Sequence, residues 1–245
     1  MNRISAIVSV WPGISARRSG PEGPEQGRNP KLRYGEKGRV WRPAAGVDAR
    51  PTTSYTCKSV RGAQKMQPLQ PDQATFLLHM ALPALKNEHR VTRKIIEAVP
   101  AEHGDYRPDS VSKSALELAW HIASAEAFFM DGVAAGAFNY QGGGRPDSIR
   151  NAADVAAWYG AAFQTNFDRL TQLSSEQLLK VVDFRGLFQY PAVLYLQFAL
   201  NHSIHHRGQL SVYLRPMGAK VPSIYGESYD DAQARKAAHA PAGTA

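Results

Sequence analysis

Apolar residues recur at helical spacing in four stretches of this 245-residue chain, all of them after Met66. The stretches run from about 72 to 99, from 110 to 136, from 148 to 173 and from 190 to 215. Spacings of three and four residues place apolar side chains on one stripe of a helix, which can then pack against other helices. No set of alternating strands and no internal repeat interrupts this pattern. The chain is therefore expected to be all-α, with the four stretches forming a four-helix bundle.

Side chains that can cap a helix stand at the start of the first two stretches, namely Asp72 and Ser110 or Ser112, and the third helix is expected to begin at about Ser148 or Asn151. The oxygen of such a residue accepts a hydrogen bond from a backbone N–H that has no partner in the first turn. A helical turn from 174 to 177 and an extended piece from 181 to 184 separate the third stretch from the fourth. The predicted bundle therefore has rather long connections.

Composition divides the chain into three parts. Residues 1–65 contain 13 Lys and Arg against 4 Asp and Glu, so this segment accounts for the net charge of +8 and the pI of 9.6. It is rich in Gly, Pro and Ser with few clustered apolar residues, and we expect a disordered N-terminal extension. Residues 66–231 are expected to form the bundle, and residues 232–245 a frayed C-terminal tail.

The basic extension has three interpretations. It can be an arm that binds nucleic acid or another acidic surface, or a transit peptide. We favour the third, in which it is a disordered leader or the result of an over-long start-site assignment. The remainder of the chain is close to neutral and has no interleaved basic and aromatic residues, so a nucleic-acid partner is not expected.

The number of cysteines and the lengths of the apolar runs indicate the cellular compartment. Cys57 is the single cysteine, so no disulfide can form within the chain, which favours a reducing cytoplasm. No apolar run approaches the roughly 18–20 residues of a membrane span. The short run from Ile4 to Trp11 is interrupted by Pro12 and Gly13, which argues against a signal peptide. We therefore expect a cytoplasmic protein without a membrane partner.

Three histidines, His202, His205 and His206, fall within five residues of the fourth apolar stretch. On a helix, His202 and His206 lie one turn apart on a face that Tyr195 and Ala199 share. Two imidazoles in this arrangement can bind one metal ion, whereas burying them without partners is unfavourable. The alternative is a pair of core histidines that bond to carbonyls or hydroxyls. A metal site would also need a third ligand from elsewhere in the chain.

His121 is the candidate for that third ligand. Its helical neighbours Ala125 and Phe128 place it on the apolar stripe of the second stretch. Considered alone, it would be interpreted as a core histidine that bonds to a serine or a carbonyl. Considered with His202 and His206, it predicts a site in which three histidines hold one metal ion.

Three segments together resemble the DinB/YfiT-like superfamily: His202-Ser203-Ile204-His205-His206-Arg207-Gly208-Gln209-Leu210, Ala119-Trp120-His121-Ile122 and Gly218-Ala219-Lys220-Val221-Pro222. The resemblance covers about residues 68–231. It implies a four-helix bundle that holds a divalent metal ion through three histidines, here His121, His202 and His206, and it implies a homodimer. His205 could compete with His206 as a ligand. We prefer His206 because it shares the stripe of His202 more closely.

The resemblance implies two alternative functions. Characterised relatives use low-molecular-weight thiols, which indicates a metal-dependent enzyme, a thiol-dependent S-transferase or a hydrolase that acts on a small-molecule substrate. Zinc or nickel suits three imidazoles, with iron and manganese as further choices. The chain has no H-E-x-x-H glutamate between the ligands, so a general base would have to come from the substrate, Glu126 or Tyr213. The alternative is a non-catalytic metal-binding stress-response protein, in which His89 or Glu88 closes the site as a fourth ligand.

Overall fold

The computed structural model describes residues 68–140 and 144–239. The predictions for residues 1–65, including Cys57, and for the last residues of the C-terminal tail lie outside the described residues. The described residues belong to one compact unit that begins at Pro68. Within them, no helix combines the length and the apolar character that crossing a membrane requires.

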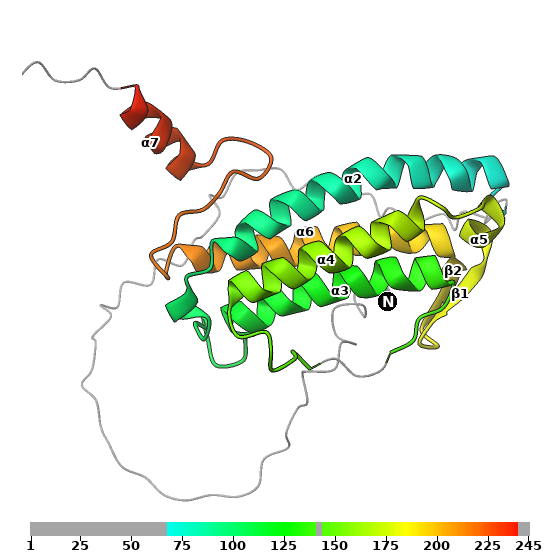
Figure 1. Ribbon diagram of the computed structural model, residues 1–245, viewed down its shortest axis with the longest axis horizontal. Helices are drawn as coiled ribbons and strands as arrows, with labels where there is room; N and C mark the ends of the chain where they lie inside the picture. The colour runs from blue at the N-terminus through cyan, green and yellow to red at the C-terminus, as the bar shows by residue number, and fades with distance from the viewer. Residues whose placement is uncertain (1–67, 141–143, 240–245) are drawn as a thin grey trace, which may run out of the picture. The chain divides into compact units, whose positions relative to one another are not determined.

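Four long helices form the body of this unit (Figure 1). They are α2 (Pro71–Glu97), α3 (Ala115–Ala135), α4 (Ala152–Leu170) and α6 (Tyr195–Leu214). Short 3-10 turns, η2 (Ala101–His103) and η3 (Ala192–Leu194), lie before α3 and α6. Helix α3 packs against α4 and α6, and α2 packs against the same two helices. The predicted all-α four-helix bundle is confirmed, since each long helix buries its apolar stripe against two others.

The start of α3 is set by a reciprocal cap. Ser114 accepts a hydrogen bond from the backbone N–H of Glu117 at 3.2 Å, and the Glu117 side chain accepts one from the backbone N–H of Ser114 at 2.8 Å. The prediction of Ser110 or Ser112 as this cap was wrong. The carboxylate of Asp109 binds the backbone N–H of Ser112 at 2.8 Å, which holds that stretch in a loop before the helix.

Helices α2 and α4 begin close to their predicted positions. Asn151 caps α4 by accepting a hydrogen bond from the backbone N–H of Asp154 at 2.9 Å, so the helix begins at the second of its two predicted start positions. Helix α2 begins at Pro71, where the missing N–H of proline leaves no helical hydrogen bond unmade. Asp72 therefore lies in the first turn of α2 instead of capping it.

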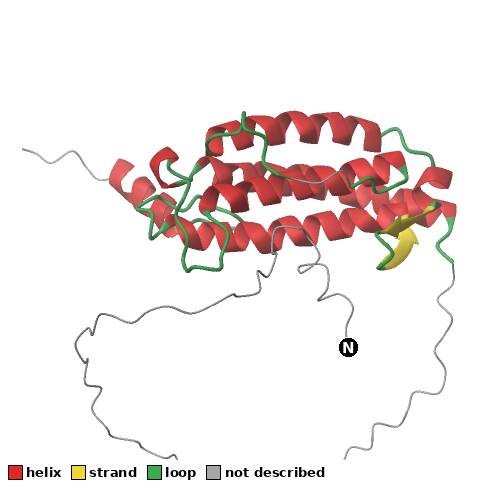
Figure 2. Cartoon of the chain, turned by 90° about the horizontal axis from the view of Figure 1, so that it is seen from below, coloured by secondary structure: helices red, strands yellow, loops and turns green. Residues whose placement is uncertain are grey.

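A β-hairpin lies between α4 and α6, at one end of the bundle (Figure 2). It follows the short helix α5 (Ser175–Leu179) and consists of β1 (Val181–Phe184) paired antiparallel with β2 (Phe188–Pro191). Strand β1 was expected as an extended piece, whereas β2 was not expected. The fourth helix was predicted from Tyr190, so Tyr190 and Pro191, the last two residues of β2, fall within the range predicted as helix. That helix begins only at Tyr195.

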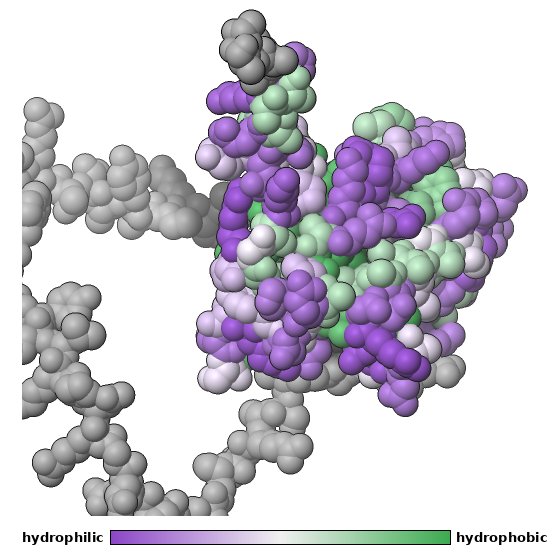
Figure 3. Space-filling model, turned by 60° about the vertical axis from the view of Figure 1, so that its left-hand side comes forward, coloured by the Kyte–Doolittle hydropathy of each residue, from purple (hydrophilic) through white to green (hydrophobic). Residues whose placement is uncertain are grey.

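A further helix, α7 (Tyr229–Ala238), corrects the prediction of a frayed tail from residue 232. Ser228 caps it by accepting a hydrogen bond from the backbone N–H of Asp231 at 3.1 Å, and Arg235 lies in its last turn, where a positive charge is favourable. None of its residues is buried, so no apolar stripe marked it in the sequence. Hydrophilic residues cover much of the molecular face in Figure 3, with hydrophobic residues exposed between them.

A polar layer divides the core of the bundle into two apolar clusters. The cluster at the hairpin end includes Leu78, Phe129, Phe163 and Leu196, and the other cluster includes Ile96, Ile122, Val155 and Leu210. Helices α2, α3 and α6 contribute buried polar residues between the two clusters: Glu88, His89, Thr92, His121, Glu126, Ser203, His206 and Arg207. Buried polar groups need hydrogen-bond partners or a bound ion, so this layer is where chemistry is to be sought.

Candidate metal site

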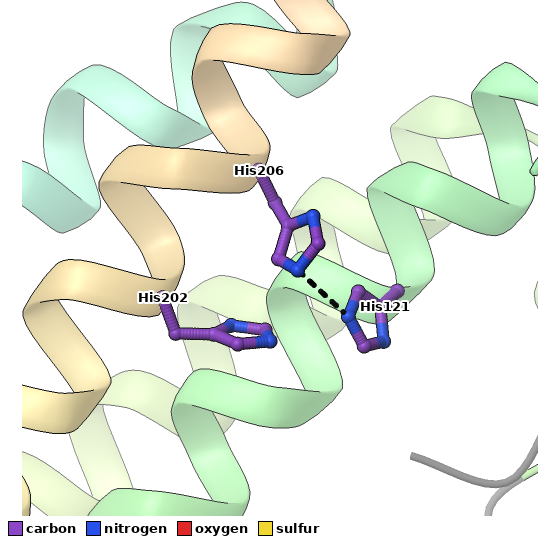
Figure 4. Close-up of side chains that lie close together, drawn as sticks. All are labelled: His121, His202 and His206. Atoms are coloured by element: carbon purple, nitrogen blue, oxygen red, sulfur yellow. Dashed lines mark hydrogen bonds between the residues drawn. The ribbon is translucent and has the colours of Figure 1, made fainter. Parts of the chain in front are cut away.

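Three imidazoles in the polar layer point toward one another (Figure 4). His121 comes from α3, and His202 and His206 come from successive turns of α6. One nitrogen of each ring lies within 4.8 Å of a nitrogen of the other two. The Nε2 atoms of His121 and His206 are 3.2 Å apart. Two helices thus bring together the three side chains for which the sequence predicts a shared site.

The spacing of two of these nitrogens suits a shared metal ion. Zinc binds imidazole nitrogens at about 2.0–2.1 Å, so two ligand nitrogens of a tetrahedral zinc site are roughly 3.3 Å apart. The distance of 3.2 Å between the Nε2 atoms of His121 and His206 is close to that value. One pair of the cluster therefore has the spacing of zinc ligands, and His202 supplies a third donor nitrogen within 4.8 Å of both.

Burial keeps the three imidazoles neutral. His121 and His206 are each 6% exposed, and His202 is partly buried. Loss of hydration disfavours the imidazolium form. It lowers the pKa of His121 to about 3 and that of His202 to about 2, and it also lowers the pKa of His206. Neutral imidazoles keep the lone pairs that a metal ion requires.

Two other candidates from the sequence, His205 and Tyr213, have ring contacts of their own. His205 is exposed, and its ring contacts that of His206 with centroids 4.8 Å apart. Tyr213, a candidate general base, packs edge-on against Tyr106 with ring centroids 5.7 Å apart. Within residues 68–140 and 144–239, no fourth His, Cys, Asp or Glu joins the three histidines. The arrangement therefore has three nitrogen donors and leaves further coordination positions to other molecules.

Glu126, the other candidate base, is a buried hydrogen-bond acceptor. It is 1% exposed, and Ser203 donates its hydroxyl to one carboxylate oxygen at 2.7 Å. Nδ1 of His89 lies 3.4 Å from the other oxygen. Burial and the negative charge of Glu126 raise the pKa of Tyr159, which packs on His89, well above its ordinary value. His89 is thus part of a buried network around Glu126 and does not act as a fourth ligand of the triad.

Arg207 is the centre of a second buried network. Its guanidinium is 2.5 Å from Glu88 and 3.2 Å from the hydroxyl of Thr92, and it donates to the hydroxyl of Tyr225 at 2.6 Å. Tyr225 in turn donates to Glu88 at 2.9 Å. Glu88 therefore pairs with Arg207 and is not available to close the metal site.

Sequence reasoning missed both networks. Ser203 and Glu126 are 77 residues apart in the chain, and Arg207 and Glu88 are 119 residues apart. No local spacing rule connects such pairs. The available signal was that a serine and an arginine occur within a helix too apolar to lie on the surface.

The fold and the site together define a four-helix-bundle protein with a candidate three-histidine metal centre. The sequence model of the DinB family matches residues 74–239, which is more than half of the chain and includes all three histidines. The chain therefore belongs to the DinB family, as the sequence motifs predicted.

Two proteins of Bacillus subtilis (strain 168) are similar in sequence. The uncharacterized protein YjoA is 31% identical over 133 residues, which cover 53% of this chain and 84% of YjoA. The uncharacterized protein YrdA is 26% identical over 146 residues, which cover 59% of this chain and 85% of YrdA. Both similarities thus extend over most of the relative's length.

Two crystal structures of DinB-like proteins resemble the fold. That of YjoA from Bacillus subtilis aligns with a TM-score of 0.50 at 26% identity, over 61% of this chain and 99% of YjoA. That of a protein from Bacillus cereus aligns with a TM-score of 0.52 at 23% identity, over 60% of this chain and 97% of the other. The bundle is therefore the part of the chain that these proteins share.

Proposed function

We propose that this chain is a divalent-metal-dependent enzyme that acts on a small-molecule substrate. The observation that carries the proposal is the convergence of His121, His202 and His206 on one point between α3 and α6. Three histidine ligands leave positions for water or substrate, as catalytic zinc sites do and closed structural sites do not. Zinc or nickel suits this donor set best, with iron or manganese as further choices.

The reaction that we propose is transfer to a low-molecular-weight thiol or hydrolysis. A metal ion held here would lower the pKa of a water or a thiol and so provide a nucleophile near neutral pH. The contribution of the chain is to hold three neutral imidazoles at fixed positions on two packed helices, where burial suppresses competition from protons. The thiol and a homodimeric assembly come from the family resemblance and form part of the proposal.

One observation favours a second function. His121 and His206 are each only 6% exposed, and an ion shared between them would connect α3 with α6. In this alternative the protein binds a metal ion without catalysis, and the ion stabilises the bundle in the way that structural metal sites do.

The first test is metal analysis of the protein purified without a histidine tag, together with His121→Ala, His206→Ala and His205→Ala. We expect near-stoichiometric metal in the wild type. His121→Ala and His206→Ala should lose it, because each removes one of three ligands. His205 provides the matched control, since it lies on α6 next to His206 but is exposed and outside the triad, so that His205→Ala should keep the metal.

The outcomes separate the two functions. A wild-type protein that stays metal-free after incubation with zinc, nickel and manganese would contradict both. If the metal binds as expected, thiols are screened with electrophilic and with hydrolysable substrates. Turnover that disappears in His121→Ala supports the enzyme. Metal removal that lowers the melting temperature, without turnover of any substrate, supports the alternative.

A further inference from the structure

Gln209 contacts the Nδ1 edge of the His206 ring, whereas Nε2 on the opposite edge belongs to the three-histidine cluster. The two residues are three positions apart on α6, and Oε1 of Gln209 lies 2.6 Å from Nδ1 of His206. A carbonyl oxygen can only accept a hydrogen bond, so the proton between these atoms belongs to Nδ1. A neutral imidazole carries one proton, and Nε2 of His206 therefore presents its lone pair.

That lone pair is directed at the centre of the triad. Nε2 of His206 lies 3.2 Å from Nε2 of His121, and Figure 4 shows the two atoms facing each other. Because Nε2 of His206 is an acceptor, the proton shared by the two rings belongs to Nε2 of His121. His206 is thus already in the tautomer that offers Nε2 to a metal ion, whereas the Nε2 proton of His121 must leave or move to Nδ1 before that atom can bind one.

We propose that Gln209 is a positioning residue, which fixes the ring of His206 with Nε2 toward the triad and thereby raises the affinity of the site for metal. This inference rests on the proposed function, since it assigns a role at the same site. Partners of this kind orient metal-bound histidines in many proteins, and their loss typically weakens metal binding by about 10–100-fold. Gln209 is exposed and lies outside the apolar core, so packing does not explain its contact with His206.

The test compares three variants on α6. Gln209→Leu keeps the approximate size of the side chain but removes the acceptor, and Gln209→Glu keeps an acceptor oxygen within similar reach. Gln197→Leu is the matched control, because Gln197 is an exposed glutamine of the same helix that donates to Asn201 at 2.8 Å. Zinc affinity is measured by competition with a chromogenic chelator. The tautomer of His206 is measured by ¹⁵N NMR on the metal-free protein.

We expect Gln209→Leu to bind zinc about 10–100-fold more weakly, while Gln209→Glu and Gln197→Leu bind it at least nearly as tightly as the wild type. The NMR spectrum should show the Nδ1–H form of His206 in the wild type and in Gln209→Glu, and a mixture of forms in Gln209→Leu. A role confined to helix stability would leave the tautomer unchanged. Unchanged zinc affinity together with an unchanged tautomer in Gln209→Leu would overturn the proposal.

The two readouts also separate this inference from the proposed function. If the wild type binds no metal, the proposed function fails and the tautomer comparison alone decides on Gln209. Loss of the Nδ1–H form in Gln209→Leu would then still support the positioning of His206, and its retention would overturn it.

Discussion

Burial of the imidazoles lowers the pKa of His121 to about 3 and that of His202 to about 2, from an ordinary value of 6.5. A histidine with an ordinary pKa is half protonated at about pH 6.5, and its proton then competes with a metal ion for the same nitrogen. The lowered pKa values move this competition to acidic solution. They also affect the fold: as the pH falls from 6.5 toward 3, the unfolded chain takes up protons that the folded histidines do not, so the metal-free protein loses stability.

At the residue scale, we therefore predict that metal affinity is nearly independent of pH around neutrality. Between about pH 8 and pH 6, we expect it to fall by less than about threefold, whereas three exposed histidines would lose roughly 70-fold over the same range. Chelator competition at a series of pH values measures this directly. A short peptide with three exposed histidines provides the reference, and an equally steep decline in protein and peptide would contradict the prediction.

The sequence predicted this part of the site because it depends on local spacing. His202 and His206 are one turn apart, and His121 lies on an apolar stripe, so their burial on facing helices follows from periodicity. The contact between His206 and Gln209 was not predicted. Although these residues are only three apart, the contact depends on the rotamers of both side chains, and spacing does not determine rotamers.

At the scale of elements, α6 is the helix that connects the site with the C-terminal segment. It directs His202 and His206 toward His121 of α3, and Arg207 toward Glu88 of α2. The hydroxyl of Tyr225, which lies 18 residues after Arg207, completes the Arg207–Glu88 pair. A second link, between Arg215 and Asp230, holds the start of α7 to the end of α6. The segment after the bundle is thus attached to it through polar contacts.

We predict that Tyr225→Phe loosens this segment while the bundle stays folded. The change removes one hydroxyl that bonds two charged groups, each such bond contributing about 1.5–3 kcal/mol where it is well shielded. Since the Tyr225 side chain is 68% exposed, we expect the lower end of that range, on the order of a tenfold increase in local opening. Hydrogen exchange of residues 221–239 measures it. Tyr229→Phe is the control, because Tyr229 is equally exposed in the same segment, and equal exchange in both variants would rule out the proposed attachment.

The sequence was least informative about elements without a distinct apolar stripe. Helix α7 has no buried residue, so hydrophobic periodicity could not indicate it. The capping residue Ser228 was the feature of the sequence that marked its start. Strand β2 had the opposite problem, since Tyr190 was interpreted as the start of the apolar pattern of the following helix. The hairpin becomes recognisable only through the tight turn at Arg185 and Gly186, which both adopt positive φ angles.

At the scale of the whole molecule, the polar layer connects all four long helices around the carboxylate of Glu126 and the ring of His89. Glu126 of α3 accepts the hydroxyl of Ser203 from α6 and lies 3.4 Å from Nδ1 of His89 in α2. Tyr159 of α4 packs on His89 with ring centroids 4.1 Å apart. The helical residues of the two apolar clusters on either side follow from periodicity. The pairing inside the layer does not, because it depends on how the four helices are aligned along their axes.

This alignment leads to a prediction about stability. Glu126→Ala should lower the free energy of unfolding by about 3–5 kcal/mol, because it leaves the buried hydroxyl of Ser203 without its acceptor and opens a cavity in the core. Glu126→Gln keeps an acceptor for Ser203 but removes the negative charge beside His89, and we expect a smaller loss of about 1–3 kcal/mol. Urea unfolding of the metal-free protein, followed by circular dichroism, measures both changes.

Glu97→Ala is the reference for this comparison. Glu97 pairs with Arg93 on the exposed side of α2, where both side chains are nearly half exposed, so its loss should change stability by less than about 1 kcal/mol. The ranking Glu126→Ala, Glu126→Gln, Glu97→Ala therefore tests whether the carboxylate holds the four helices together. If Glu126→Ala were as mild as Glu97→Ala, the polar layer would not contribute to folding, and the alignment of the helices would have to come from the two apolar clusters alone.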